Sequence, residues 1–188
     1  MEGVGRAGYV LVGGRSSRMG RDKALLAAGP RTLVEQTADY VKKAAGNATL
    51  IGSPERYAFL GLPVIADRVE GHGPLGGLYT ALRDTTADWN LIVACDMPGI
   101  TPDFLRTLFE AAEKSGKECL VPVVAGGLEP LCAIYHARVL SAAESAVKAK
   151  RLKMQDFVRG LDAVLWPIED AHLVRNLNTP EELAAELK

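Results

Sequence analysis

The sequence predicts an α/β fold, in which one mostly parallel sheet is covered by helices on both faces. Short apolar runs of strand length alternate with longer segments whose apolar residues recur every three or four positions. Alternating strands and helices favour a parallel sheet buried on both sides, which gives a Rossmann-like arrangement. No repeat, low-complexity segment or linker divides the 188 residues, so we expect a single domain over residues 1–188.

The composition argues against several classes of protein. Hydrophobic residues make up 48% and charged residues 24%, which argues against disorder. The formal net charge of −1 indicates neither a nucleic-acid nor a membrane partner, and no apolar run approaches the roughly 20 residues that span a bilayer. Residues 1–6 are too short and polar for a signal peptide. Three scattered cysteines show neither disulfide nor metal-ligand spacing, so we expect a cytoplasmic protein.

In the first half, the expected strands and helices follow from apolar runs and from the glycines and prolines that interrupt them. Residues 9–12 form a short apolar run that opens into a glycine-rich loop, and residues 32–45 have a helical apolar face. Residues 48–51 end at Gly52 followed by Ser-Pro, residues 55–60 suit a short helix, and residues 63–66 suit a third strand. A helix over 75–83 begins just after Pro74.

The second half contains the clearest strand, residues 89–94. Thr101 is a helix N-cap with Pro102 at the first helical position, followed by a buried stripe. Strands are expected at 119–124, 131–135 and 163–166, and helices at 139–147 and 154–158. Thr179-Pro-Glu-Glu182 is a capping box that begins a last helix. Ligands of such sheets bind at the carboxyl ends of the strands, where the loops after Val12 and Ala94 should meet.

The loop after the first strand has the chemistry of a phosphate site. Glycines expose backbone N–H groups to a ligand, and cations offset the charge of a polyphosphate. The loop carries three glycines and four cations within eleven residues: Gly13, Gly14, Gly20, Arg15, Arg18, Arg21 and Lys23. A plain strand-to-helix turn would need fewer of both. The loop is no Walker A element, because Arg21 follows Gly20 in place of Lys-Ser/Thr.

Two aspartates follow expected strands and should point into the same crevice. Asp96 comes two residues after the end of the 89–94 strand, and a carboxylate there can hold Mg²⁺ together with phosphate oxygens. Alternatively, Asp96 caps the following turn or helix. Asp67 ends the 63–66 strand, and it either binds a ribose or base or caps its loop.

Two further motifs admit both a functional and a structural interpretation. Gly71-His-Gly-Pro-Leu-Gly76 matches the dinucleotide pattern, but Pro74 removes a donor that a pyrophosphate would need. We interpret it as a tight loop whose backbone, including Gly76, meets a flat ligand such as a base. Asn176 and Asn178 face the same way on an extended segment and either orient a ligand or satisfy backbone groups. No histidine has a nucleophile partner, which disfavours a hydrolase triad.

The segment Leu11-Val-Gly-Gly-Arg-Ser-Ser-Arg-Met-Gly-Arg-Asp-Lys23 resembles the opening signature of the molybdenum cofactor guanylyltransferases. These enzymes belong to the wider nucleotidyltransferases with a Rossmann-like fold. The likeness continues, in order, through Asp67, Gly73-Pro-Leu-Gly-Gly77, Cys95-Asp-Met-Pro98, Glu129-Pro-Leu-Cys-Ala-Ile-Tyr135 and Asn176-Leu-Asn-Thr-Pro180. The opening motif alone is shared with other nucleotidyltransferases, whereas the later motifs favour the molybdenum cofactor guanylyltransferases among them.

The resemblance implies transfer of GMP from Mg-GTP to the terminal phosphate of molybdenum-carrying molybdopterin, with release of pyrophosphate. It implies contacts to the nucleotide from Leu11, Val12, Gly13, Lys23 and Asp67. Asp96 would bind Mg²⁺. The phosphate loop would contain Gly14, Arg18 and Gly20, and the substrate side of the crevice would contain Asn176 and Asn178. Lys23, Arg18 and Asp96 with its magnesium would then neutralise the charge that moves onto pyrophosphate. GTP and molybdopterin are the implied small-molecule partners, beside proteins that deliver the cofactor or accept the product.

Two positions bear on the details. The family often has asparagine where this chain has Gly52, so that side-chain contact is lost or replaced. Gly13 and Gly14 resemble the guanylyl enzymes, whereas related cytidylyl enzymes tend to have alanine in place of Gly13. The alternatives are a cytidylyl- or sugar-1-phosphate nucleotidyltransferase, a non-catalytic nucleotide-binding protein and, more distantly, a dinucleotide-binding oxidoreductase.

Overall fold

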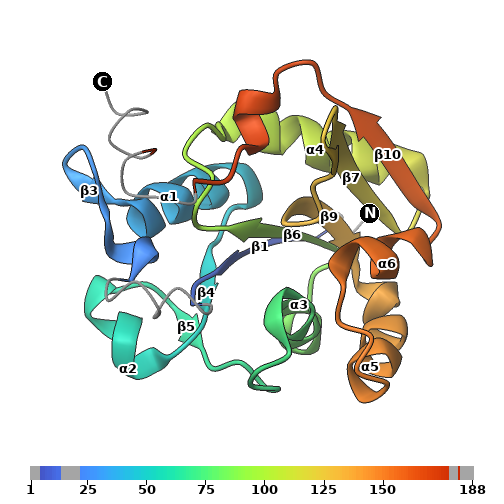
Figure 1. The fold of residues 1–188 in the computed structure, drawn as a ribbon, viewed down its shortest axis with the longest axis horizontal. Coiled ribbons are helices and arrows are strands. Elements are labelled where there is room, and N and C mark those ends of the chain that lie inside the picture. Colours follow the sequence, from blue (N-terminus) through green and yellow to red (C-terminus); the bar gives the residue numbers. More distant parts are fainter. Residues whose placement is uncertain (1–4, 14–21, 178–181, 183–188) are drawn as a thin grey trace.

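The computed structural model describes residues 5–13, 22–177 and 182, and within them it has a central sheet between two layers of helices (Figure 1). The main sheet contains β1 Arg6–Leu11, β4 Thr49–Ile51, β5 Val64–Ile65, β6 Trp89–Ala94, β7 Cys119–Val124, β8 Gly127–Leu128, β9 Cys132–His136 and β10 Ala163–Pro167. A separate hairpin is formed by β2 Ala27–Ala28 and β3 Arg31–Thr32. The helices are α1 Leu33–Ala45, α2 Pro54–Tyr57, α3 Gly73–Asp84, α4 Pro102–Ser115, α5 Leu140–Lys148 and α6 Met154–Arg159. Short 3₁₀ turns are η2 Lys23–Leu25, η3 Ala58–Leu60, η4 Ala137–Val139 and η5 Ala171–Val174.

The sheet is mostly parallel, as the sequence predicts. Its strand order is β10-β7-β9-β6-β1-β4-β5, with β8 paired to β7. β1 is parallel to its neighbours β4 and β6, and β5 is parallel to β4. β9 runs antiparallel to both β6 and β7, whereas β10 is parallel to β7. The carboxyl ends of β1, β4, β5 and β6 therefore lie along one edge of the sheet.

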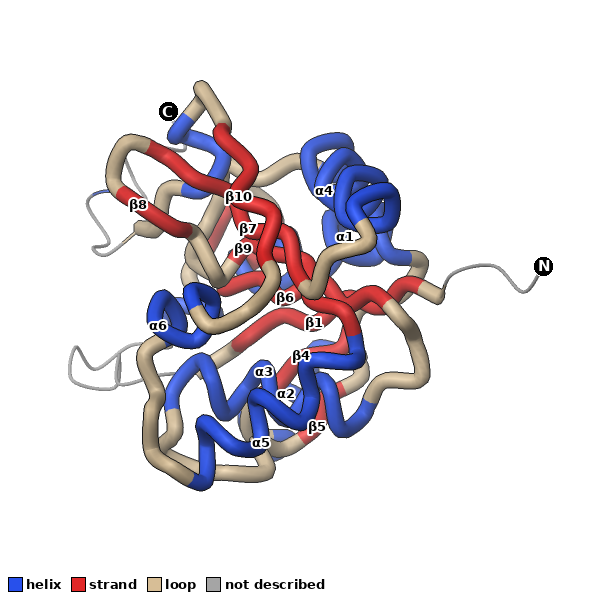
Figure 2. The backbone as a smooth tube through the Cα atoms, turned by 90° about the vertical axis from the view of Figure 1, so that its right-hand side faces the viewer, coloured by secondary structure: helices blue, strands red, loops and turns tan. Residues whose placement is uncertain are grey.

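Each face of the sheet has its own hydrophobic core. Val10 and Val93 pack with residues of α1 and α4 on one face. Their neighbours in sequence, Tyr9 and Ile92, pack with residues of α3, α5 and α6 on the other face, and Figure 2 shows the helices on the two sides of the sheet. Because successive strand residues point to opposite faces, burial on both sides makes these strands continuously apolar.

The ends of the helices follow from their caps. Thr32 and Glu35 form a complete capping box at the start of α1, and Thr101 accepts a hydrogen bond from the backbone N–H of Phe104 at the start of α4. The expected start of the third helix, just after Pro74, was wrong by two residues. α3 begins at Gly73 and takes Pro74 into its first turn, where a missing N–H costs no helical hydrogen bond.

The remaining differences from the expected elements are small. β1 begins at Arg6, three residues earlier than predicted, and Arg6 pairs there with Glu113 of α4 (2.6 Å between Nε and Oε1). The hairpin β2–β3 and strand β8 were not predicted. The helix expected after Thr179 lies outside the described residues except for Glu182. No helix within the described ranges is long and apolar enough to cross a membrane.

Candidate active site

Three predicted site residues, together with Gly52, follow neighbouring strands at one edge of the sheet. Gly13 comes after β1, Gly52 after β4, Asp67 after β5 and Asp96 after β6. Backbone hydrogen bonds hold the first two loops to the neighbouring strands, from Val12 N to Ile51 O (3.0 Å) and from Gly52 N to Ile65 O (3.0 Å). The topology thus brings these four residues to the carboxyl edge, where open α/β sheets bind ligands.

Asp96 is the predicted metal ligand at this edge of the sheet. The residue is partly buried, and its Oδ1 atom is buried without a hydrogen-bond partner among the described residues. Desolvation raises the pKa of the Asp96 carboxyl, while a hydrogen bond with its own backbone and the charge of Lys23 act in the opposite direction. A buried carboxylate oxygen without a partner is costly in a fold, and a bound cation would satisfy it.

Lys23 reaches the same place from the loop after β1. Its Nζ donates to the carbonyl oxygen of Leu177 (3.4 Å), and the N–H of Leu177 donates to the carbonyl oxygen of Asp96 (2.8 Å). Leu177 itself is buried against Ala28 and Leu33 of the β2–β3 hairpin and α1. Three segments that are far apart in the sequence are thereby joined beside the Asp96 carboxylate.

A second aspartate, Asp22, fixes the position of Lys23. Its Oδ1 accepts from the N–H of Ala24 (3.1 Å), which caps the short η2 turn that contains Lys23. Its Oδ2 accepts from the hydroxyl of Tyr57 (2.6 Å) and lies 3.8 Å from Nη1 of Arg56. Sequence reasoning missed both Asp22 and Tyr57. Asp22 stands next to Lys23 in the opening motif, whereas nothing in the sequence near Tyr57 indicated this contact.

Gly52 has no room for a side chain. A Cβ atom there would lie 2.7 Å from the carbonyl oxygen of Val12 and 3.2 Å from the Tyr57 ring. The loops after β1 and β4 therefore approach each other more closely than any side chain at position 52 would allow. Gly13 needs glycine for a different reason, since its φ of 96° lies in the left-handed region.

Asp67 does cap its own loop, which was one of the two predicted roles. Its Oδ1 accepts from the N–H of Val69 (3.2 Å) and from the hydroxyl of Thr80 in α3 (3.0 Å). The same hydroxyl accepts from the N–H of Arg68 (3.0 Å). These bonds occupy one carboxylate oxygen, so capping and a contact to a ribose or base through the other oxygen are compatible.

The glycines of the loop before α3 serve packing. Gly76 is buried, and a Cβ atom there would lie 3.1 Å from Val69 Cγ2 and 3.2 Å from its carbonyl oxygen. At Gly77 a Cβ atom would lie 2.7 Å from Cδ2 of Leu11. The two glycines let α3 approach its own loop and the end of β1. The contact of Gly76 with a flat ligand stays a prediction.

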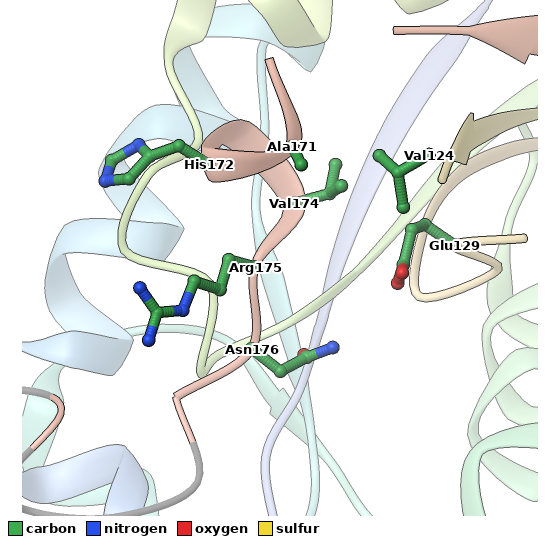
Figure 3. A pocket seen from close by; sticks show the side chains of 7 residues that line it. All are labelled: Val124, Glu129, Ala171, His172, Val174, Arg175 and Asn176. Carbon is green, nitrogen blue, oxygen red and sulfur yellow. The ribbon is translucent and has the colours of Figure 1, made fainter. Parts of the chain in front are cut away.

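Asn176 lies at an open pocket beside the β7–β8 hairpin. The pocket has a volume of 460 Å³ and is lined by Val124, Glu129, Ala171, His172, Val174, Arg175 and Asn176. Figure 3 shows Val124 and Val174 pointing toward each other, with the Glu129 carboxylate and the Asn176 amide on one side of the segment 171–176. The side chains of His172 and Arg175 point to its other side. No role was predicted for Glu129 from the sequence, although this residue begins one of the motifs that carry the family resemblance.

Several predicted residues cannot be placed. Gly14, Arg18 and Gly20, together with Arg15 and Arg21, belong to the loop outside the described residues, as does Asn178. Their contacts with phosphate or substrate stay predictions.

The metal prediction can be tested against the donor set. Among the described residues, no three His, Cys, Asp or Glu side chains lie close enough to form a metal site. The unsatisfied Oδ1 of Asp96 fits Mg²⁺, which commonly takes one or two carboxylates and completes its shell with phosphate oxygens and water.

Cys95 is not a nucleophile in this site. The residue is buried, and desolvation followed by the charge of Asp96 raises the pKa of its thiol to about 12. The thiolate needed for nucleophilic attack is thus absent near neutral pH. Cys95 therefore behaves as a small buried residue.

Comparisons with known proteins point to one family. The family model of the MobA-like NTP transferase domain matches residues 8–164. A protein of Pelotomaculum thermopropionicum described as "Probable molybdenum cofactor guanylyltransferase" is 37% identical over 151 residues, covering 80% of this chain and 73% of its own length. A protein of Carboxydothermus hydrogenoformans with the same description is 32% identical over 186 residues, covering 95% and 93%.

Solved structures show the same architecture. The crystal structure of molybdopterin-guanine dinucleotide biosynthesis protein A from Archaeoglobus fulgidus superposes with a TM-score of 0.80 at 26% identity, covering 95% of each chain. The 2-C-methyl-D-erythritol 4-phosphate cytidylyltransferase of Thermus thermophilus gives a TM-score of 0.71 at 18% identity, covering 96% of each chain. At that identity the likeness shows the shared Rossmann-like nucleotidyltransferase fold alone.

Proposed function

Because this chain belongs to the family of MobA-like NTP transferase domains and is a nucleotidyltransferase, we propose that it transfers GMP from Mg-GTP to the terminal phosphate of molybdopterin that carries molybdenum. Pyrophosphate is released, and the product is the guanine dinucleotide form of the cofactor. Two relatives described as probable molybdenum cofactor guanylyltransferases match 80% and 95% of the chain and support this choice of substrates. Partner proteins that deliver the cofactor or accept the product, and a cytoplasmic location, stay expectations of the sequence.

The observation that carries the proposal is the meeting of Lys23 and Asp96. An ammonium group, and a carboxylate oxygen without a hydrogen-bond partner in the described part of the chain, lie on loops joined through Leu177 at the carboxyl edge of the sheet. A magnesium triphosphate has complementary parts, since its metal needs a carboxylate and its phosphate oxygens need a cation. Neither group alone would favour a triphosphate over another anion or a free cation.

The reaction is a substitution at the α-phosphorus of GTP. An oxygen of the acceptor's terminal phosphate forms the new P–O bond, and the bond to the bridging oxygen of pyrophosphate breaks, so that pyrophosphate leaves with the electron pair. Near neutral pH the attacking phosphate is already ionised, so no strong general base is required. The chain's contribution is then to align the two anions and to offset their repulsion.

Each described residue has a defined part in this mechanism. Lys23 stabilises the negative charge that develops on the leaving pyrophosphate. Asp96 would hold Mg²⁺, which supplies charge neutralisation and polarises the phosphoryl oxygens when bound. Asp22 and Tyr57 keep the turn that contains Lys23 in place. Arg18 is proposed as a second cation on the same phosphates, on the basis of the motif.

The guanine preference rests on the opening motif and on the described relatives. The left-handed backbone at Gly13 supports it, because an alanine in the same conformation would be strained by roughly 1 kcal/mol or more. The cytidylyl relatives, which tend to have alanine there, would then need a different loop conformation. At position 52 the family often has asparagine, whereas this chain has glycine and no room for a side chain, so the contact made by that asparagine is lost or replaced.

The direct test is a transfer assay with purified protein, magnesium, molybdopterin and each of GTP, CTP, UTP and ATP. We expect the guanine dinucleotide and pyrophosphate from GTP alone. Activity with CTP in place of GTP would contradict the base assignment. Nucleotide binding without pyrophosphate release, for every acceptor tried, would favour a non-catalytic nucleotide-binding protein.

A further inference from the structure

The 460 Å³ pocket beside the β7–β8 hairpin has one apolar side and one polar end. Its volume falls in the roughly 300–1,000 Å³ range of small-molecule sites. Val124 supplies an apolar wall against which a flat ring can lie, with the buried Val174 packed behind it, while Glu129 and the amide of Asn176 supply polar groups (Figure 3). Pockets with apolar walls and a few placed polar groups bind heteroaromatic ligands.

Glu129 is the unusual member of this lining. Its backbone is fixed, with its N–H bonded to the carbonyl oxygen of Pro122 (2.9 Å) and its carbonyl oxygen accepting from the N–H of Cys132 (3.2 Å). Its carboxylate is partly buried, and desolvation raises the pKa of Glu129 with no hydrogen bond or ion pair among the described residues to offset it. A desolvated carboxylate at a pocket wall can accept hydrogen bonds from the N–H groups of a bound ligand.

The chemistry of a carboxylate restricts the ligand that it can recognise. An ionised carboxylate only accepts hydrogen bonds, and its two oxygens suit two parallel N–H groups. The 2-amino-4-oxopyrimidine ring presents such a pair, an amino group beside a ring N–H. Phosphate and dithiolene groups are anionic and would be repelled by Glu129. The same charge thus attracts the ring and directs the anionic end of a ligand elsewhere.

Two substrates of the proposed reaction contain this ring edge, guanine in GTP and the pterin in molybdopterin. The strand order distinguishes them. Gly13, Gly52 and Asp67 follow β1, β4 and β5 on one side of β6, whereas the pocket lies by β7 on the other side, with Asp96 between. If the nucleotide lies over β1, β4 and β5 with its phosphates at Asp96, the ring on the β7 side belongs to the acceptor.

We propose that Glu129 is a specificity-determining residue for the acceptor, because its carboxylate accepts hydrogen bonds from the amino and ring N–H groups of a pterin that lies against Val124. Asn176 lies at the same end of the pocket, where its amide can donate to the 4-oxo group. This assignment rests on the proposed function, because only that function makes the acceptor a pterin. It accounts for a desolvated carboxylate at a pocket wall that has no ion pair among the described residues.

The test uses two ring systems that differ at one group. 6-Hydroxymethylpterin carries the 2-amino group, and 6-hydroxymethyllumazine carries a carbonyl oxygen in its place. We expect the wild-type protein, titrated by ligand fluorescence, to bind the pterin about 10- to 100-fold more tightly than the lumazine, since one charge-assisted bond is replaced by repulsion between oxygens. Glu129→Gln should abolish this preference, because a glutamine amide can donate to the lumazine carbonyl. The control variant Glu144→Gln changes an exposed carboxylate paired with Lys148 on α5 and should retain it.

Steady-state kinetics give the second readout. Glu129→Gln should raise the KM for molybdopterin about 10- to 100-fold and leave the KM for GTP unchanged. A raised KM for GTP with an unchanged acceptor KM would overturn the proposal and assign the pocket to guanine. An unchanged pterin preference in Glu129→Gln would overturn it as well. Failure of the proposed function looks different, since the wild-type protein itself would then make no guanine dinucleotide, while the ring preference is measured without turnover.

Discussion

The substitution Asp96→Asn separates stability from activity. Asp96 has a folded pKa above that of the unfolded chain, because desolvation outweighs the attraction of Lys23. Above the folded pKa the ionised side chain therefore opposes folding, and this penalty is relieved as the pH falls through that value. Asparagine has nearly the same shape without the charge, so the substitution should remove the penalty at neutral pH.

The size of the effect follows from the contacts. An unsatisfied buried polar atom costs about 1–3 kcal/mol, and more when it is charged. Of the two Asp96 carboxylate oxygens, only Oδ1 lacks a partner among the residues that the structure describes. Asparagine keeps an oxygen at this position, and the attraction of Lys23 is lost. We therefore take the lower end, about 1 kcal/mol of added stability, which raises Tm by about 2–4 °C for a domain of this size.

Calorimetry and a pyrophosphate-release assay measure the two effects on the same samples. Asp96→Asn should unfold at a higher temperature and lose magnesium-dependent turnover. Saturating Mg-GTP should raise the Tm of the wild-type protein by about 5–10 °C at a hundredfold excess over Kd, and that of the variant by much less. Asp88→Asn is the matched control, since Asp88 is exposed at the opposite end of β6. Full activity in Asp96→Asn would refute the metal role, and a Tm lowered by several degrees would refute the reasoning on desolvation.

Three other perturbations test the site. Gly52→Ala places a Cβ atom 2.7 Å from the carbonyl oxygen of Val12 and should destabilise the fold by about 1–3 kcal/mol; an unchanged urea midpoint would contradict the close approach. Tyr57→Phe removes the 2.6 Å bond to Asp22, so the KM for GTP should rise about tenfold while the acceptor KM is constant; equal changes in both would show a general loss of structure. Acceptor affinity should fall as the pH drops through the raised pKa of Glu129, because only the ionised carboxylate accepts two N–H groups; a Glu129→Gln protein with the same pH profile would exclude this residue as the cause.

The fold was predictable because its strands and helices are locally distinct. Residues 89–94 form β6 with the predicted bounds, since an apolar run of that length is buried on both faces of the sheet. The direction of β9 was not predictable, because an antiparallel strand buried in the same sheet has the same apolar composition as its parallel neighbours. The hairpin β2–β3 consists of two-residue strands, too short for any alternation to be visible.

Candidate site residues could be predicted where they depend on residue type at a strand end. Lys23 and Asp96 were predicted because a cation in a glycine-rich loop and an aspartate after a buried strand each indicate a chemistry. Tyr57 and Thr80 were missed because their contacts, with Asp22 and Asp67, depend on which loops meet in space. Glu129 was missed because a lone glutamate is ordinary until a structure shows it desolvated at a pocket wall.

Most side-chain substitutions would not reveal the link that Leu177 makes between Lys23 and Asp96. Both of its bonds use backbone atoms, the N–H toward Asp96 and the carbonyl oxygen toward Lys23, so neither depends on which side chain stands at position 177. Alanine scanning would report only the apolar packing of Leu177 against Ala28 and Leu33. Proline would be the informative replacement, because it deletes the N–H while retaining an apolar side chain. One contact that positions Lys23 is thus made by backbone atoms alone, and a comparison of residue identities would not detect it.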